Sequence, residues 1–580
     1  MVRPFDYTER AHKCFRCTVT LPDDPADGMT LLDWPEVCRC FIRTIGNDPA
    51  LAEFETMQNY AARMPGGDLV LEAELQLTSP EHPDWTRLRI GIPLSELDAS
   101  VRELELTYTG PRFRLSANGK VLDEECPFGD PPGEPPPEFV IAPEKELPPE
   151  PQELSEPLHL WSPPGRNEWA GDVAVGYFNG EYHLFYLHDR KHHYSSFWAG
   201  SHTWHHLVSR DLKNWRNDGE ILPHDAQYIS YGTGTPFLYK GRIFLTYGLH
   251  TGRYLPPGTA PRGATWAEST DGCCFTPSRK IFHRSENPSV LNGEGGELLF
   301  FAGFGREEMQ LLRSRNFPVF EPEAVAVFPL EEKSATGHTA ECPAYFSWHG
   351  KHYLLVGFSG FYSADTPDFA NFRDLAAEGR DLYDGLEVPM VAPFAGDRRI
   401  LAGWLRMNDL WGGVLGLREL VWCEDGIPGI RWLEEAMPHH GKWAVLPEDG
   451  RVESCCYLQI CCEPGKPVNI RLSGEGEDIE IRLFPERQKA ELVWAPVRDY
   501  PVVPAFPSKR RPGGCAAGNL RGLEEPYTLR VLIRHDRKWQ GTVVDVEIAG
   551  MRTLIRHFPG HRTRQVTLTP GVACQTAVLE

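Results

Sequence analysis

Two acidic residues occupy equivalent positions in two copies of an internal repeat. Asp172 lies in the run NEWAGDVAVGYFNGEYHLFY, 8 residues before the turn glycine of its copy, and Glu341 lies in TAECPAYFSWHGKHYLLVG, 9 residues before that glycine. Carboxyl groups that converge on one site can share the roles of nucleophile, acid and base. In a third copy Asn287 takes this position, in SENPSVLNGEGGELLFF. Its amide can donate and accept hydrogen bonds but carries no charge.

The repeat that aligns these residues predicts how they come together. A glycine turn followed by an alternating strand recurs as YFNGEYHLFY, LYKGRIFLTY, LNGEGGELLFF, SWHGKHYLLVG and FAGDRRILAGW, at intervals of 61, 55, 54 and 46 residues. One such unit is too small to bury its own apolar face, so the repeat predicts five blades around an axis. A propeller brings residues from successive blades to one mouth, where we expect Asp172, Asn287 and Glu341 to converge.

The composition supports an all-β protein and argues against some classes of binding partner. The chain has 580 residues with 54 Gly, 51 Pro and 11% aromatic residues, which favours short strands joined by many turns. A net charge of -22 argues against nucleic acid and against anionic membrane surfaces. The chain has no apolar signal core and no apolar run of 18 residues, and its 15 cysteines include adjacent pairs. We therefore expect a cytoplasmic protein with reduced thiols and no membrane partner.

Three β domains are predicted along the chain. Residues 1–130 alternate like a β-sandwich, and the runs LEAELQL and FRLSANGKVLDEECPFG resemble a concanavalin-like jelly roll. Residues 131–157 are rich in proline and are interpreted as a linker. The five-bladed β-propeller is expected over residues 158–440, and a C-terminal β-sandwich over residues 441–580.

The middle and C-terminal parts resemble glycoside hydrolase family 32, which includes invertases, levanases, inulinases and fructosyltransferases. The resemblance rests on the order Asp172–Asn287–Glu341, on the ECP tripeptide, and on the runs NGEYHLFY, VSRDLKNW, RRILAGW and WGGVLGLRELVWCEDG. It covers roughly Leu158 to Glu580. The resemblance implies retaining hydrolysis of fructofuranosyl linkages, with Asp172 as nucleophile and Glu341 as general acid and then base. It implies no cofactor.

The sequence also departs from the family pattern. The family has Arg-Asp-Pro where this chain has Glu286-Asn287-Pro288, and Asn-Asp-Pro-Asn where this chain has Gly-Asp172-Val-Ala. A missing carboxylate weakens the stabilisation of an oxocarbenium-like centre. The alternatives are a catalytically weak or silent carbohydrate-binding propeller, a family-43-like arabinosidase or xylosidase, and a fructosyltransferase.

The remaining candidates are residues for substrate binding at the expected mouth, and the expected partner is a small carbohydrate, either a fructoside or a short oligosaccharide. They are Asp189, Arg190, His192, Trp198, Thr233, Glu286, Asp384 and Glu387. Two groups have metal-binding residue types, the six histidines between His188 and His206 and the set Cys14-x-x-Cys17 with Cys38-x-Cys40. Neither has convincing zinc spacing, so we expect no metal. The oligomeric state is left open, a homo-oligomer included.

Overall fold

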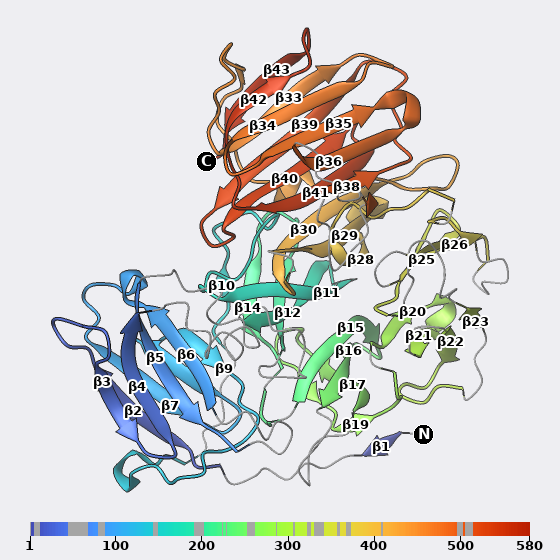
Figure 1. Ribbon diagram of the computed structural model, residues 1–580. Coiled ribbons are helices and arrows are strands. Elements are labelled where there is room, and N and C mark those ends of the chain that lie inside the picture. The colour runs from blue at the N-terminus through green and yellow to red at the C-terminus, as the bar shows by residue number, and fades with distance from the viewer. Residues whose placement is uncertain are drawn as a thin grey trace.

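The computed structural model is all-β, as predicted, with strands and short 3-10 helices (Figure 1). It describes the chain apart from residues 1, 5–11, 45–67, 79–86, 143–148, 191–201, 223, 228, 252–261, 286, 305–307, 322–325, 330–340, 357–359, 367–372, 377, 408–409, 496–502 and 505–513. In Figure 1 an N-terminal block (blue) and a C-terminal block (orange to red) flank a middle block. No helix within the described ranges is long and apolar enough to cross a membrane.

The middle of the described chain consists of five consecutive four-stranded antiparallel units. The first comprises β11 (Glu168–Phe178), β12 (Glu181–Arg190), β13 (Thr203–Ser209) and β14 (Arg216–Glu220). The second comprises β15 (Ile229–Tyr239), β16 (Arg242–Thr251), β17 (Gly263–Ser269) and β18 (Thr276–Pro277). The third comprises β20 (Ser289–Asn292), β21 (Leu298–Phe304), β22 (Glu308–Ser314) and β23 (Ala326–Pro329). The fourth comprises β24 (Ala344–Trp348), β25 (Lys351–Val356), β26 (Gly360–Ala364) and β27 (Arg373–Asp374). The fifth comprises β28 (Glu387–Phe394), β29 (Arg398–Arg406), β30 (Gly413–Val421) and β31 (Gly429–Trp432).

The glycines of the sequence repeat make the same turn in every unit. All five have φ between 73° and 82°, a left-handed conformation that glycine adopts without a steric penalty. They are Gly180, Gly241, Gly296, Gly350 and Gly396. The first and last units are joined because β30 pairs with β11 through Gly413 and Ala170. This pairing closes the ring, so the propeller fold expected from the repeat is present.

The N-terminal block is a sandwich of two four-stranded sheets. One sheet has β2 (Phe15–Thr20), β7 (Glu103–Tyr108), β8 (Phe113–Ala117) and β9 (Lys120–Glu125). The other has β3 (Thr30–Trp34), β4 (Cys38–Thr44), β5 (Leu69–Gln76) and β6 (Arg87–Pro93). Asn118 and Gly119 form the left-handed hairpin turn between β8 and β9. Cys17 and Cys40 lie in the shared apolar core, where burial raises the pKa of each thiol to about 12.

The C-terminal block is a sandwich of two six-stranded sheets around a second apolar core. One sheet has β32 (Ala444–Val445), β43 (Ala573–Val578), β33 (Cys455–Cys462), β39 (Tyr527–Asp536), β40 (Gly541–Ile548) and β41 (Arg552–Pro559). The other has β37 (Val503–Pro504), β38 (Gly514–Ala517), β36 (Lys489–Ala495), β35 (Asp478–Phe484), β34 (Val468–Glu475) and β42 (Arg562–Leu568). The 15 cysteines of the chain, all within the described residues, form no disulfide bond.

Two segments connect the blocks more closely than the sequence indicates. The chain start, β1 (Arg3–Pro4), pairs with β19 (Lys280–Ile281) beside the second unit and not with the N-terminal sandwich. The proline-rich segment packs at both ends, through Phe139 on the ring of Trp34 and through β10 (Gln152–Glu153), which pairs with β14. The described 3-10 helices are η2 (Leu94–Glu96), η3 (Pro137–Phe139), η4 (Glu294–Gly296), η5 (Ala395–Asp397), η6 (Glu434–Ala436) and η7 (Pro485–Arg487).

Candidate active site

The first strand of each unit lines the axis, and three of these strands bulge near the same end. β11 contacts β15 and β28, β15 contacts β20, and β24 contacts β28. The ladder register shifts at residues 170–173 of β11, 231–234 of β15 and 387–390 of β28. A bulge releases residues from the ladder and re-aims their side chains. Asp172 and Thr233 both lie within such bulges, which brings two residues predicted from sequence together.

Asp172 is held by hydrogen bonds to both carboxyl oxygens. Thr233 Oγ1 donates to Oδ2, and Trp404 Nε1 of β29 donates to Oδ1 over 3.0 Å. Burial raises the pKa of Asp172, while these two hydrogen bonds and nearby His202 act in the opposite direction, and the charge of Glu387 raises it further. The carboxyl group is therefore oriented by its neighbours and loses its proton at a higher pH than an exposed aspartate.

Glu341 and Asp172 both lie close enough to the thiol of Cys342 for their charges to raise its pKa. Burial raises the pKa of Cys342 well above its ordinary value, and the charges of Asp172 and Glu341 raise it further. Glu341 is partly exposed directly before β24, and Cys342 has a φ of 49°, which is unusual outside glycine. The two carboxyl groups expected from sequence to converge thus share one electrostatic environment.

The third predicted position, Asn287, is partly buried just before β20, in the register of Glu341 before β24. Its neighbour Pro288 accepts a hydrogen bond from Thr246 Oγ1 over 3.3 Å, which ties this segment to the second unit. Glu286, His192 and Trp198 lie outside the described residues.

An aromatic wall stands beside Asp172. The rings of Trp404 and Trp411 are 5.3 Å apart, and His202 stacks on Trp411 at 4.0 Å. A β-carbon on Gly171 would lie only 2.0 Å from the Trp411 ring, so a larger residue directly before Asp172 would displace this ring. His202 Nε2 lies 3.3 Å from Asp189 Oδ1, which places the predicted residue Asp189 behind this wall.

Glu387 belongs to the same neighbourhood, but its charge is paired. Arg406 donates to both of its carboxyl oxygens over 2.7 and 2.6 Å, and the Arg406 guanidinium lies 5.4 Å from the Trp404 ring centre. Together with the wall, this pair surrounds Asp172 with polar and aromatic groups of the kind that bind sugar hydroxyls and ring faces.

Residues 166–410 match the family model described as the glycosyl hydrolases family 32 N-terminal domain. The propeller belongs to glycoside hydrolase family 32. The resemblance seen in the sequence is therefore confirmed.

Relatives of known name agree with this membership. The chain is 21% identical over 359 residues to a sucrose-6-phosphate hydrolase from Vibrio alginolyticus, covering 53% of this chain and 67% of the relative. It is 24% identical over 314 residues to a raffinose invertase from Escherichia coli, covering 46% and 62%. The chain thus spans about two thirds of the length of these relatives. A solved sucrose-6-phosphate hydrolase from Lactobacillus gasseri shares the fold, with a TM-score of 0.55 at 14% identity, covering 73% of this chain and 93% of that one.

Two residues predicted to contact substrate lie away from the group around Asp172. Asp384 is buried against the C-terminal sandwich, 2.7 Å from Arg418 Nε and 2.7 Å from Thr553 Oγ1. Arg190 forms an ion pair of 2.7 Å with Glu168 and lies 3.5 Å from Glu124 of the N-terminal sandwich. The sequence places both residues in segments that we expected to lie at the mouth. In the structure their side chains contact residues at the boundaries between domains.

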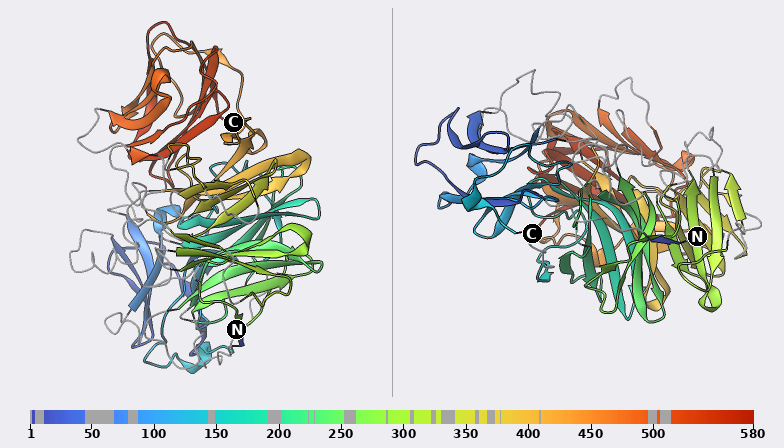
Figure 2. Two further views of the ribbon diagram at one scale, coloured as in Figure 1. Left: turned by 90° about the vertical axis from the view of Figure 1, so that its right-hand side faces the viewer. Right: turned by 90° about the horizontal axis from the view of Figure 1, so that it is seen from below.

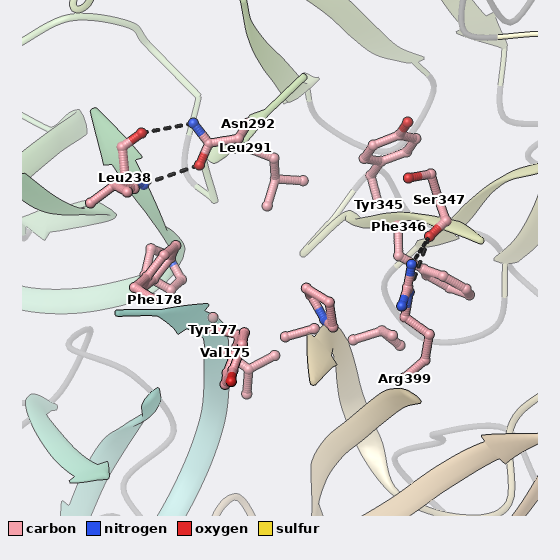
Figure 3. A pocket seen from close by; sticks show the side chains of 15 residues that line it. Val175, Tyr177, Phe178, Leu238, Leu291, Asn292, Tyr345, Phe346, Ser347 and Arg399 are labelled. Carbon is pink, nitrogen blue, oxygen red and sulfur yellow. Dashed lines mark hydrogen bonds between the residues drawn. The ribbon is translucent and has the colours of Figure 1, made fainter. Parts of the chain in front are cut away.

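A cavity lies at the other end of the same inner strands (Figure 3). It has about 400 Å³ and is lined by all five units, including Tyr177, Tyr345 and Arg399. Tyr177 lies five positions after Asp172, about 16 Å along a strand. Two of the cavity's polar side chains already have partners, since Asn292 forms hydrogen bonds with the backbone of Leu238 and Arg399 donates to the carbonyl of Ser347. This cavity is therefore separate from the group of residues around Asp172.

Three residues beside Asp172 are not among the site residues predicted from the sequence, although each lies in a motif noted there. Trp404 lies in RRILAGW, Trp411 opens WGGVLGLREL, and Cys342 is the middle of ECP. Each motif contributes to the family resemblance, and none of them by itself assigns a role to these three residues. Only the contact with Asp172 across 232 positions shows that the Trp404 indole faces the site. Among the described residues, no group of three or more His, Cys, Asp or Glu is arranged to hold a metal ion.

Proposed function

We propose that this glycosidase is a retaining hydrolase of fructofuranosyl linkages, with Asp172 as nucleophile and Glu341 as acid and base. The observation that carries the proposal is the setting of Asp172, which lies in a bulge with both oxygens oriented and with Glu341 nearby. Relatives named sucrose-6-phosphate hydrolase and raffinose invertase support a fructoside as the substrate class.

In the first step an Asp172 oxygen attacks the anomeric carbon of the fructosyl unit. The bond to the leaving oxygen breaks as Glu341 donates its proton to that oxygen, leaving a fructosyl ester on Asp172 and an ionised Glu341. Thr233 and Trp404 hold the attacking carboxylate in one orientation, so less order must be gained on the way to the transition state.

In the second step Glu341 takes a proton from water as the water oxygen attacks the anomeric carbon. The ester bond to Asp172 breaks, fructose leaves with retained configuration, and Glu341 is again protonated. This geometry requires the two carboxyl groups to lie roughly 5–5.5 Å apart.

A second candidate, a carbohydrate-binding propeller with weak or no catalysis, is favoured by one residue. Asn287 takes the place where the family carries a carboxylate, so positive charge that develops on the sugar meets an uncharged amide there. Asn287→Asp separates the candidates. A weakened enzyme gains turnover from the restored charge, whereas a silent binding protein shows none.

The direct test measures fructose released from sucrose, inulin and levan oligosaccharides. Asp172→Asn and Glu341→Gln should each remove nearly all turnover, and carbon-13 NMR of the first product should show retained configuration at the anomeric carbon. Glu321→Gln is the matched control, because this exposed acid of the third unit lies outside the site. Near wild-type turnover in either site variant would refute the role assignment, and an inverted first product would refute the two-step mechanism.

A further inference from the structure

The N-terminal sandwich meets the first propeller unit through buried charged groups. Arg112, at the end of the turn from β7 into β8, is 3% exposed. Its Nη2 donates to both carboxyl oxygens of Glu220 in β14, at 2.6 Å each, and its Nη1 donates to Glu124 of β9 over 2.9 Å. Because these groups are withdrawn from water and paired, the sandwich and the propeller are joined in one specific arrangement.

A second arginine continues this network from the propeller side. Arg190 ends β12 and lies 2.7 Å from Glu168 of β11 and 3.5 Å from Glu124 of the sandwich. Burial would raise the pKa of Glu124, but the charges of Arg112, Arg114 and Arg190 hold it below its ordinary value. The void between these groups is only about 20 Å³, space for roughly one water molecule.

The uncharged side chain of Gln227 also forms hydrogen bonds across the interface between the sandwich and the propeller. Gln227, buried in the segment between β14 and β15, projects its amide into the sandwich. Its Nε2 lies 2.8 Å from the carbonyl of Gly110 and 2.9 Å from that of Gly129, and the Gly129 N–H donates to its Oε1 over 3.1 Å. The amide is therefore matched as both donor and acceptor. In Figures 1 and 2 the blue sandwich lies against the side of the propeller.

The end of β12, which carries Arg190, is connected by contacts to the aromatic wall of the site. Asp189 precedes Arg190 on β12, pairs with Trp169 of β11, and lies 3.3 Å from His202. His202 stacks on Trp411, whose ring packs on Gly171 next to the nucleophile. A continuous chain of contacts thus runs from the sandwich to the residue before Asp172.

We propose that the N-terminal sandwich is a fixed part of the catalytic unit, and that Arg112 and Arg190 are positioning residues that hold the mouth ends of β11 and β12. This role rests on the proposed function, since it concerns the same site. It differs from that of a tethered binding module, which would swing on its linker. Displacing such a support by about 1 Å can cost up to roughly a hundredfold in rate.

The test combines hydrogen exchange with kinetics on the full chain. In Arg112→Met, amides of residues 168–172 and 187–190 should exchange faster, proteases should cut within residues 131–157, and kcat/KM should fall about tenfold, as expected for a displaced site. Arg112→Lys keeps the charge and should restore part of kcat/KM. Arg102→Met is the control, because this exposed arginine contacts Asp23 and the carbonyls of Ala99 and Val101, all within the same sandwich.

Gln227→Leu gives a second route if loss of Arg112 prevents folding, because it weakens the same interface without leaving a charge unpaired. Faster exchange together with lower kcat/KM supports the proposal. Faster exchange and linker cleavage with unchanged kcat/KM would overturn it, as would unchanged exchange at residues 168–172. If the wild-type chain released no fructose, the proposed function would fail, while the exchange of β11 would still decide whether the sandwich holds this strand.

Discussion

Replacing Arg418 by methionine removes the cation from a buried network between the propeller and the C-terminal sandwich. Arg418 of β30 is fully buried, with Nε donating to Asp384 over 2.7 Å and Nη2 donating to Asp545 of β40 over 3.0 Å. His159 Nε2 lies 2.7 Å from the other oxygen of Asp545. In the variant both carboxyl groups stay buried and lose the charge that compensates them.

The expected loss is large because a broken buried pair leaves uncompensated charge. Removing one partner of such a pair costs about 3–5 kcal/mol. At about 2–4 °C per kcal/mol for units of 150–250 residues, the unfolding transition should fall by roughly 6–20 °C. Arg471→Met is the matched control. Arg471 of β34 pairs with Asp478 over 2.7 Å, but 48% of its side chain is exposed, so its loss should cost only about 0.2–1 kcal/mol.

The pH dependence gives a second, independent readout. Burial would raise the pKa of Asp384, but Arg418 and the hydrogen bond from Thr553 hold it below its ordinary value of 3.8. The stability that this carboxylate contributes is therefore complete above pH 3.8 and is lost as pH falls through the lower pKa of the folded state. Without Arg418 burial prevails and the carboxyl group takes up a proton at higher pH. The difference between wild type and variant should therefore be largest near pH 7 and shrink toward pH 4.

Calorimetry at several pH values measures both quantities. A loss no larger than that of Arg471→Met would refute the argument that uncompensated burial dominates, and so would a difference that grows toward pH 4. Asp384→Asn adds a functional check. Because Asp384 faces the sandwich, this variant should lose stability and keep the wild-type KM for a fructoside, whereas a sugar contact would raise KM.

Three further predictions concern the site and its surroundings. Asp172→Asn should remove turnover and raise the unfolding temperature at pH 7. The reason is that the fold raises the pKa of this carboxyl group, so its ionised form opposes folding. The gain in unfolding temperature should vanish below pH 3.8. Thr233→Val removes a donor to Asp172 and should move the acid limb of the kcat/KM profile to higher pH, and an unmoved limb would mean that Asp172 does not control it. Burial lowers the pKa of Lys538 to about 8 from 10.5, so calorimetry should show wild type gaining stability over Lys538→Met between pH 8 and 10.5, and a constant difference would contradict this.

Local pattern was enough to predict the strands and the order of the units. Alternation of apolar side chains identifies strands because only neighbours two positions apart share a face. Gly180 and its four counterparts identify the turns because their positive φ is a local requirement of the backbone. The register of Asp172 and Glu341 follows from the same repeat. The catalytic roles of these two residues stay predictions until the variants are measured.

The assignment of individual polar residues could not be predicted in this way. Asp384 and Glu387 are three positions apart in one short segment, yet one pairs with Arg418 against the sandwich and the other pairs with Arg406 near Asp172. Nothing in the local sequence distinguishes them, because the pattern of polar and apolar residues is the same whichever arginine pairs with the carboxylate. The choice depends on which distant strand supplies the arginine.

By itself the sequence determined an all-β chain, a glycine-turn repeat and two acids in register, since each of these depends on near neighbours along the chain. Tertiary structure alone decided which side chains surround Asp172, through bulges in three adjacent strands and through Trp404, 232 positions away. It also decided how the domains meet, for example through His159 and Asp545, which are 386 positions apart. The physical reason is that burial makes a charge depend on its partner, and that partner is supplied by the fold.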